Sequence, residues 1–236
     1  MENIVNEIKS ILFLAFPNVG EQDLFAAWEL MRAAAWNLSQ QGKTLEVSLG
    51  SFEGGVLPTH MGAHIQSERT VTSNDRFDVL YVPGGIGAGS ASKDPRILDL
   101  IRAHHAEGRW VAANCAGVGV LYRAGVLNQH EITSPASLAR RLPALGAKLV
   151  SPRRAWLVDH TNRIFTSGGA ATVHPSTIAL TRALLGEDSA RGLAQSWDTL
   201  ALHGEALFSD VGPVMNDDPV AAAALQDQLE TVFMPD

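Results

Sequence analysis

The sequence contains a single cysteine and no run of basic residues. One cysteine excludes an internal disulfide and a thiolate cluster for structural zinc. Cys115 is therefore either a small buried hydrophobe or a reactive thiol. With a formal net charge of -7 and no basic run, the chain has no surface suited to neutralising phosphates, so we expect no nucleic-acid partner.

The sequence also lacks a long apolar stretch and an interdomain linker. The apolar segment 11–16 is far shorter than the roughly 20 residues of a membrane span. Glu2 and Glu7 precede it, unlike the basic start of a secretory leader, so we expect no membrane partner and a cytoplasmic location. Without a linker or an internal repeat, we predict one α/β domain over residues 1–208. Residues 209–236 form a tail whose candidate helix, 220–233, packs on the domain or on a partner.

Strand-like and helix-like segments alternate along the chain. We predict strands at 11–16, 45–49, 77–82 and 110–113, a hairpin over 154–166, and helices at 23–41, 95–107, 175–185 and 189–200, with shorter helices after Cys115 and from Ser134. Apolar runs of strand length suit parallel strands that are buried on both faces. The pattern predicts an α/β, flavodoxin-like, doubly wound parallel sheet with helices on both faces. Ligands are then expected beyond the carboxyl ends of the strands.

Cys115 stands where a strand runs directly into a helix. In the segment GRWVAANCAGVGVL small residues surround it, as a tight nucleophile elbow requires. A helix N-terminus favours thiolate over thiol, so we expect a sulfur that is reactive at neutral pH. The alternative is a cysteine packed in the core.

Two other segments are expected at the same edge of the sheet. The turn Pro83-Gly84-Gly85 follows a predicted strand and offers bare backbone N–H groups to a ligand. Asp23 follows the loop after the first strand, where its carboxyl group is placed to exchange protons with the thiol. The alternative for Asp23 is an acidic residue that only stabilises the start of its own helix.

Three motifs, FPNVGEQDL, VPGGIGAG and NCAGVGVL, together resemble the ThiJ/PfpI superfamily of class I glutamine-amidotransferase-like proteins, over roughly residues 11–200. The likeness is greatest to isonitrile hydratases and to the ligand-sensing domains of AraC-type regulators. The resemblance implies that Cys115 is the nucleophile and Asp23 its acidic partner. It also implies that Gly85 and Ala116 supply backbone N–H groups to an anion-stabilising pocket, and that the protein is a homodimer.

The sequence departs from the family pattern at three positions. Ala116 replaces the threonine usual in hydratases, Pro135 stands where relatives carry a histidine, and Pro175 where many carry an aspartate. The pocket is therefore expected to differ, with Ile86 and His174 as candidate lining residues; the alternative for His174 is a solvent-facing helix start.

No metal site or cofactor is expected. His60 and His64 would share a helical face, but their glycine and proline neighbours argue against a helix. His104 and His105, near the end of a charged helix, are expected to be solvated.

The leading hypothesis is a cysteine-dependent hydratase or hydrolase of a small, largely apolar molecule. The specific prediction is a carbon–nitrogen lyase that hydrates an isonitrile to an N-substituted formamide through a thioimidate on Cys115. One alternative is a small-ligand sensor without turnover, although residues 209–236 hold one candidate helix where a DNA-reading module needs two or three. Another is a redox or glyoxal-stress protein that uses the same thiol.

Overall fold

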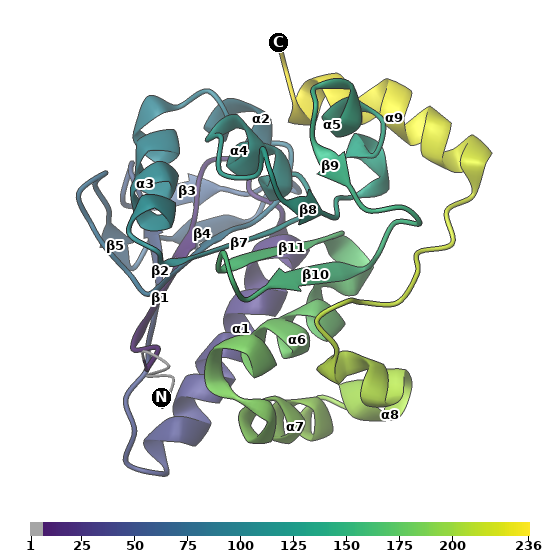
Figure 1. Ribbon diagram of the computed structural model, residues 1–236. Coiled ribbons are helices and arrows are strands. Elements are labelled where there is room, and N and C mark those ends of the chain that lie inside the picture. Colours follow the sequence, from purple (N-terminus) through teal and green to yellow (C-terminus); the bar gives the residue numbers. More distant parts are fainter. Residues whose placement is uncertain (1–6) are drawn as a thin grey trace.

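The computed structural model describes residues 7–236 and is built around one seven-stranded sheet (Figure 1). In spatial order the strands are β10 (Trp156–Asp159), β11 (Ile164–Ser167), β7 (Trp110–Asn114), β6 (Val79–Val82), β1 (Ser10–Leu14), β2 (Glu46–Ser51) and β5 (Arg69–Thr70). Neighbouring strands are parallel except β10 and β11, which form the predicted hairpin. The predicted doubly wound sheet is confirmed.

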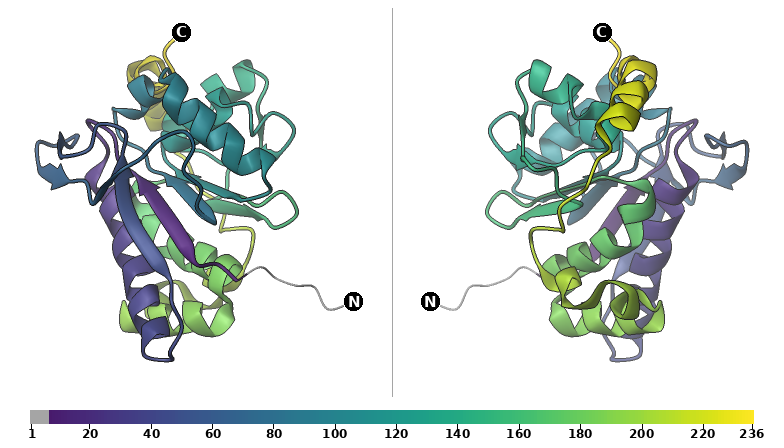
Figure 2. Two further views of the ribbon diagram at one scale, coloured as in Figure 1. Left: turned by 90° about the vertical axis from the view of Figure 1, so that its left-hand side faces the viewer. Right: turned by 90° about the vertical axis from the view of Figure 1, so that its right-hand side faces the viewer.

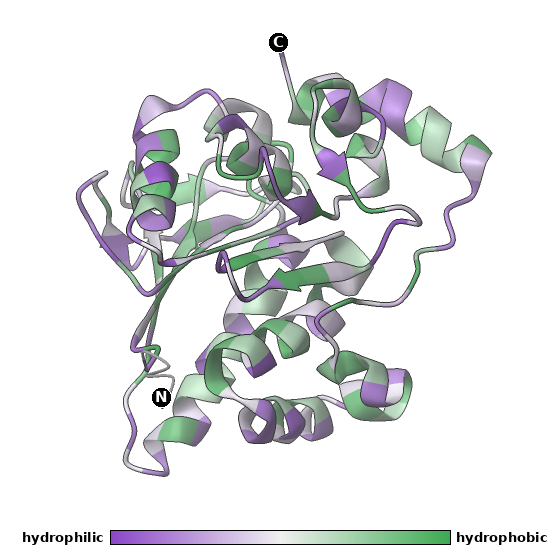
Figure 3. Cartoon of the chain, in the orientation of Figure 1, coloured by the Kyte–Doolittle hydropathy of each residue, from purple (hydrophilic) through white to green (hydrophobic). Residues whose placement is uncertain are grey.

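The central strands hold their places because they are largely apolar and buried along almost their whole length. Every residue of β6, β7 and β11 is buried, as is every residue of β1 except the first. Side chains alternate between the two faces of a strand, so such burial requires helices on both sides. In Figure 3 the hydrophobic colour continues along β10 and β11 and the neighbouring α6.

The helices form a layer on each face of the sheet (Figures 1 and 2). One layer holds the π-helical turn Gln22–Ala26, α1 (Ala27–Ser39) and α6 (Val173–Leu185). Three further elements pack outside α6: α7 (Glu187–Ser196), α8 (Thr199–His203) and the 3₁₀ turn Gly204–Phe208. The other holds α2 (Ala88–Ala91), α3 (Pro95–Ala106) and α4 (Gly117–Arg123), with α5 (Arg141–Ala144) and α9 (Pro219–Phe233) beyond them. Helix α3 begins as predicted, with Asp94 capping the N–H of Arg96.

Two small sheets were not predicted. β3 (Val56–Pro58) and β4 (His64–Gln66) form an antiparallel arm that projects from one side of the molecule in Figure 2, and β8 (Glu131–Ile132) pairs with β9 (Lys148–Leu149). The arm is tied to the loop after β1, where Asn18 N–H donates to Pro58 O at 2.7 Å and His60 N–H donates to Val19 O at 2.9 Å. These bonds bring the arm to the carboxyl end of the sheet.

Two predicted helices are wrong in extent. The segment from Ser134 forms only a 3₁₀ turn, Ala136–Leu138, before the short α5. Pro143 has no N–H to bond the carbonyl four residues earlier and its ring crowds that carbonyl, so one continuous helix cannot form. The segment 189–200 breaks at Asp198, whose left-handed φ of 54° separates α7 from α8.

The expectation that His104 is solvated is also wrong. Its side chain is fully buried and its ring stacks against Phe77 at 6.1 Å. Nε2 accepts a hydrogen bond from Phe77 N–H at 3.1 Å, and Nδ1 lies 2.8 Å from Leu100 O. This pattern requires the neutral tautomer with the proton on Nδ1. Burial accordingly lowers the pKa of His104.

No helix among residues 7–236 has the length and apolar character needed to cross a membrane. Glu2, one of the two acids that argue against a secretory leader, lies outside the described residues.

Residues 209–236 pack along the domain. Val211 and Val214 form isolated bridges to Leu157 and Arg154 beside β10. Farther on, Phe233 and Met234 at the end of α9 join the main hydrophobic core. A side chain at Gly119 in α4 would collide with the sulfur of Met234, so the tail and the helix after Cys115 are in close contact.

We expect Met234→Ala to lower the free energy of unfolding by about 2–4 kcal/mol, because it removes a fully buried side chain and leaves a cavity. Val220→Ala is the matched control, since Val220 is 79% exposed on the same helix and its loss should change stability by no more than about 0.5 kcal/mol. Urea denaturation measures both. Equal midpoints for the two variants would show that the tail does not stabilise the domain.

Candidate active site

The carboxyl ends of four neighbouring strands bring the candidate catalytic groups together. Asp23 follows β1, Gly84 and Gly85 follow β6, Cys115 follows β7, and Ala170 follows β11. β1 and β6 are paired, yet the chain leaves them toward opposite sides of the sheet. Such a switch point is the place where open α/β sheets bind ligands.

Cys115 occupies a strained turn between β7 and α4. Its φ of 48° lies in the left-handed region, which is unfavourable for any residue but glycine. Its backbone N–H donates to Ser167 O at 3.1 Å, which holds the turn against β11. The side chain is half-buried, and the N–H groups of Gly85 and Ala116 hydrogen-bond to its sulfur. The sulfur is therefore held at a turn with two donors facing it.

The carboxyl group of Asp23 faces the same sulfur. Asp23 is 7% exposed, its Oδ1 accepts a hydrogen bond from Ala170 N–H at 2.9 Å, and its side chain also hydrogen-bonds to Cys115. No side chain caps the start of the π-helical turn that contains Asp23. The carboxyl group thus bonds across the site to the segment after β11, and the alternative of a simple helix-start acid does not describe it.

The pair of acid and thiol retains a proton. Burial raises the pKa of Asp23, and burial together with the negative charge of Asp23 raises the pKa of the Cys115 thiol. The N–H groups of Ala116 and Gly85 act in the opposite direction, but more weakly. Burial and the charge of Asp23 therefore act against the expectation of a thiolate at neutral pH, which was drawn from the helix N-terminus alone. Desolvation and a neighbouring carboxylate outweigh the helix dipole.

Glycines allow the groups to approach one another. A Cβ at Gly84 would lie 2.5 Å from the Cβ of Cys115 and 2.6 Å from Oδ2 of Asp23. At Gly169, where φ is 78°, a Cβ would overlap Cys115 and lie 2.8 Å from Oδ1 of Asp23. Any larger residue at these two positions would push the thiol and the carboxyl group apart.

Asn114 is a site residue that the sequence reasoning missed. Its side chain is fully buried; Nδ2 donates to the backbone oxygen of Asp23 at 2.9 Å, and Oδ1 accepts from Gly84 N–H at 3.0 Å. One amide thus joins the segments that follow β1, β6 and β7. The only signal in the sequence was a polar residue that ends an otherwise apolar strand beside the cysteine.

A cavity of about 520 Å³ opens beside Asp23, and the β3–β4 arm supplies its outer wall. It is lined by Gly20, Glu21, Gln22, Asp23, His60, Met61, Ala63 and Ala170. Glu21 holds the arm, because its Oε1 accepts hydrogen bonds from the Thr59 hydroxyl and, at 2.8 Å, from Met61 N–H. The sequence argued against His60 as a metal ligand. The structure places it in the lining of the cavity beside Asp23, on the β3–β4 arm, which was not predicted.

The two candidate pocket residues do not line this cavity. His174 lies in the first turn of α6 and lines a neighbouring cavity instead. Ile86 follows Gly85, is 37% exposed, and is absent from the lining of both cavities.

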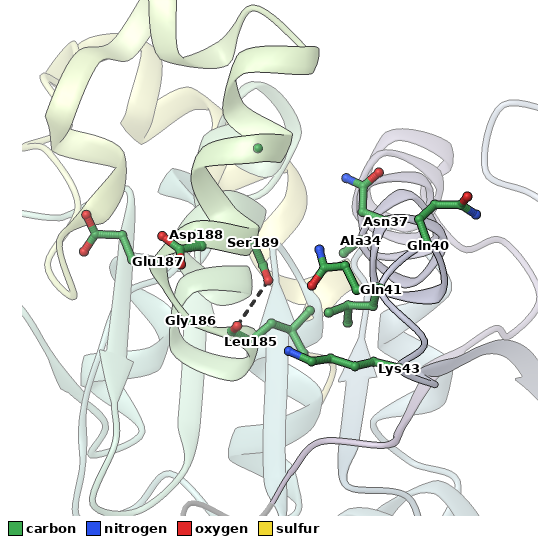
Figure 4. Close-up of a pocket in the computed structure, with 12 residues that line it drawn as sticks. Ala34, Asn37, Gln40, Gln41, Lys43, Leu185, Gly186, Glu187, Asp188 and Ser189 are labelled. Carbon is green, nitrogen blue, oxygen red and sulfur yellow. Dashed lines mark hydrogen bonds between the residues drawn. The ribbon is translucent and has the colours of Figure 1, made fainter.

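A further hollow of about 500 Å³ lies at the other end of the molecule, between the end of α1 and the start of α7 (Figure 4). Lys43, Glu187 and Asp188 are among its lining residues, and Ser189 Oγ donates to Leu185 O at 3.2 Å. The 13-residue α1 separates it from Asp23 by roughly 20 Å, so it plays no part in the site. Residues 7–236 contain no group of three or more histidine, cysteine or acidic side chains that could hold a metal.

Asp23→Asn should shift the pH midpoint of Cys115 alkylation downward by about one pH unit or more, because it removes the negative charge that raises the thiol pKa. The pH dependence of the iodoacetamide labelling rate, followed by intact mass up to about pH 11, shows the displacement of the titration curve directly because the chain has one cysteine.

Asp188→Asn, at the remote hollow, is the control and should leave the midpoint unchanged. An upward shift in Asp23→Asn would contradict our assignment of the proton, because it would mean that Asp23 is the protonated partner and donates to a thiolate.

Comparison with known proteins identifies the family. A model of the DJ-1/PfpI family matches residues 9–182. The isonitrile hydratase of Pseudomonas putida is 30% identical over 181 residues, which cover 76% of this chain and 73% of that protein. The crystal structure of Drosophila melanogaster DJ-1beta matches with a TM-score of 0.71 at 23% identity, covering 80% of this chain and 97% of that one. An AraC family transcriptional regulator from Pseudomonas putida matches with a TM-score of 0.66 at 16% identity, covering 80% and 99%. The resemblance drawn from the three motifs is confirmed, and the chain belongs to the DJ-1/PfpI family.

Proposed function

We propose that the protein hydrates a small isonitrile to an N-substituted formamide, with Cys115 as nucleophile and Asp23 as proton carrier. The observation that carries the proposal is the buried contact between the Asp23 carboxyl group and the Cys115 thiol, with the N–H groups of Gly85 and Ala116 at the sulfur. The likeness to an isonitrile hydratase, at 30% identity over three quarters of the chain, supports it.

The reaction begins with proton transfer. Asp23 accepts the thiol proton as the sulfur forms a bond to the terminal isonitrile carbon, so the raised thiol pKa is overcome only when substrate is present. Asp23 then returns the proton to that carbon, which gives a neutral thioimidate on Cys115. Burial raises the pKa of Asp23, so its carboxyl group is a better proton acceptor than an exposed aspartate, which suits this exchange.

Water completes the cycle. Its oxygen adds to the carbon of the thioimidate, and one of its protons passes through Asp23 to the imine nitrogen. The tetrahedral adduct then expels the sulfur, and its hydroxyl proton returns to the thiol as the formamide leaves. Gly85 and Ala116 donate to the sulfur as it regains negative charge. The proton released by the added water balances the proton that the thiol regains, so no cofactor is required.

The redox or glyoxal-stress alternative uses the same thiol. Peroxide oxidises thiolates faster than thiols, and burial raises the pKa of Cys115, which slows that oxidation. A ligand sensor would not need a reactive sulfur, so experiments on Cys115→Ser distinguish a sensor from an enzyme. The homodimer and the cytoplasmic location stay predictions.

We expect the protein to convert para-nitrophenyl isonitrile to the corresponding formamide, measured by liquid chromatography of the product. Cys115→Ser should abolish turnover, and Asp23→Asn should lower kcat by about 10²-fold or more, because it can no longer carry the proton. Asp188→Asn should retain the wild-type rate.

Two other results would support the alternative functions. Conversion of methylglyoxal without formamide production would replace hydration by glyoxal chemistry at the same thiol. Tight isonitrile binding without turnover, unchanged in Cys115→Ser, would make the protein a sensor.

A further inference from the structure

A second cavity adjoins the one that contains Asp23. It has a volume of about 330 Å³ and lies between the start of α6 and the α7–α8 junction. Gln22 and Ala170 line both cavities. Ala170 also donates its backbone N–H to Asp23, so the second cavity begins one residue away from the reacting carboxyl group.

Trp197 forms a fixed wall of this second cavity. Its side chain is half-buried and packs against the smaller hydrophobic cluster that includes Leu30 and Leu193. The chain turns sharply after it, because Asp198 has a left-handed φ of 54° and the Thr199 hydroxyl donates to Trp197 O at 3.3 Å. The indole is therefore held by the core and by the turn while it lines the cavity.

The two cavities differ in charge. Glu21 and Asp23 line the first, whereas no aspartate, glutamate, lysine or arginine lines the second. The second combines Trp197, Leu202 and Pro175 with the imidazoles of His174 and His203. An apolar and aromatic wall without aspartate, glutamate, lysine or arginine suits an uncharged ring.

We propose that this second cavity, which we call the Trp197 subsite, binds an aromatic substituent on the isonitrile nitrogen. The inference rests on the proposed function, because it places the reacting carbon at Cys115 and the ring beyond Ala170. The size is sufficient, since about 150 Å³ accommodates a benzene ring and the subsite has about 330 Å³. His174, the candidate pocket residue of the sequence, would then contact the substituent and not the reacting carbon.

The first test measures binding without turnover, in the Cys115→Ser background, by calorimetric titration with N-phenylformamide. Trp197→Ala should weaken binding by about tenfold, because it removes the aromatic face, and Trp197→Phe should recover most of it. Trp36→Ala is the matched control, since Trp36 is 66% exposed on α1 and lines neither cavity.

Leu202→Asp is a second variant that leaves the fold intact, because Leu202 is 79% exposed. The charge it adds to an uncharged cavity should also weaken N-phenylformamide binding. Full-strength binding in both Trp197→Ala and Leu202→Asp would overturn the subsite, as would equal weakening in Trp36→Ala.

The second test uses the wild-type thiol and compares phenyl with methyl isonitrile. Trp197→Ala should raise KM for the phenyl compound about tenfold with little change in kcat, and should leave both constants for the methyl compound unchanged. An equal change for both compounds would contradict a substituent subsite. If no isonitrile is turned over while N-phenylformamide still binds through Trp197, the proposed function fails and the subsite stands. If turnover occurs but does not depend on Trp197, only the subsite fails.

Discussion

A half-buried thiol and a buried carboxyl group meet at the carboxyl edge of the sheet, and the rest of the site is arranged around this contact. Each group alone would be costly to ionise there, and a second negative charge beside the first costs more still. Asp23 and Cys115 therefore keep a proton between them. In the proposed reaction, the sulfur gives up this proton only when a substrate that can receive it is bound.

The sheet and its loops hold this contact in place. Strands buried on both faces cannot shift without exposing apolar side chains, so the ends of β1, β6, β7 and β11 are fixed relative to one another. Asn114 then joins three of the segments that leave these ends, and Gly84 and Gly169 leave room for the reacting groups. Preorganisation of this kind lets a weak nucleophile act without a large rearrangement.

The two cavities differ in the charged groups and in the chain segments that line them. The acidic one beside Asp23 is bounded on its outer side by the β3–β4 arm, which Glu21 holds by two hydrogen bonds. The uncharged one beside Trp197 is attached to the smaller hydrophobic cluster on the outer side of α6. In the proposed function, segments outside the central sheet would therefore select the substrate, whereas the sheet itself holds the candidate reacting groups.

The sequence by itself determined the doubly wound sheet, the strand-to-helix turn at Cys115, and the expectation that Asp23, Gly85 and Ala116 lie at the same edge. These follow from local apolar runs, small residues and chain order, which act over short distances along the chain. Only the tertiary structure decided that Asn114 bonds to a residue 91 positions away, that His60 and Trp197 line adjoining cavities, and that His104 is buried. It also decided the state of the thiol, because a pKa depends on every charge and on all the water that folding brings near the sulfur or removes from it, and no local pattern records that balance.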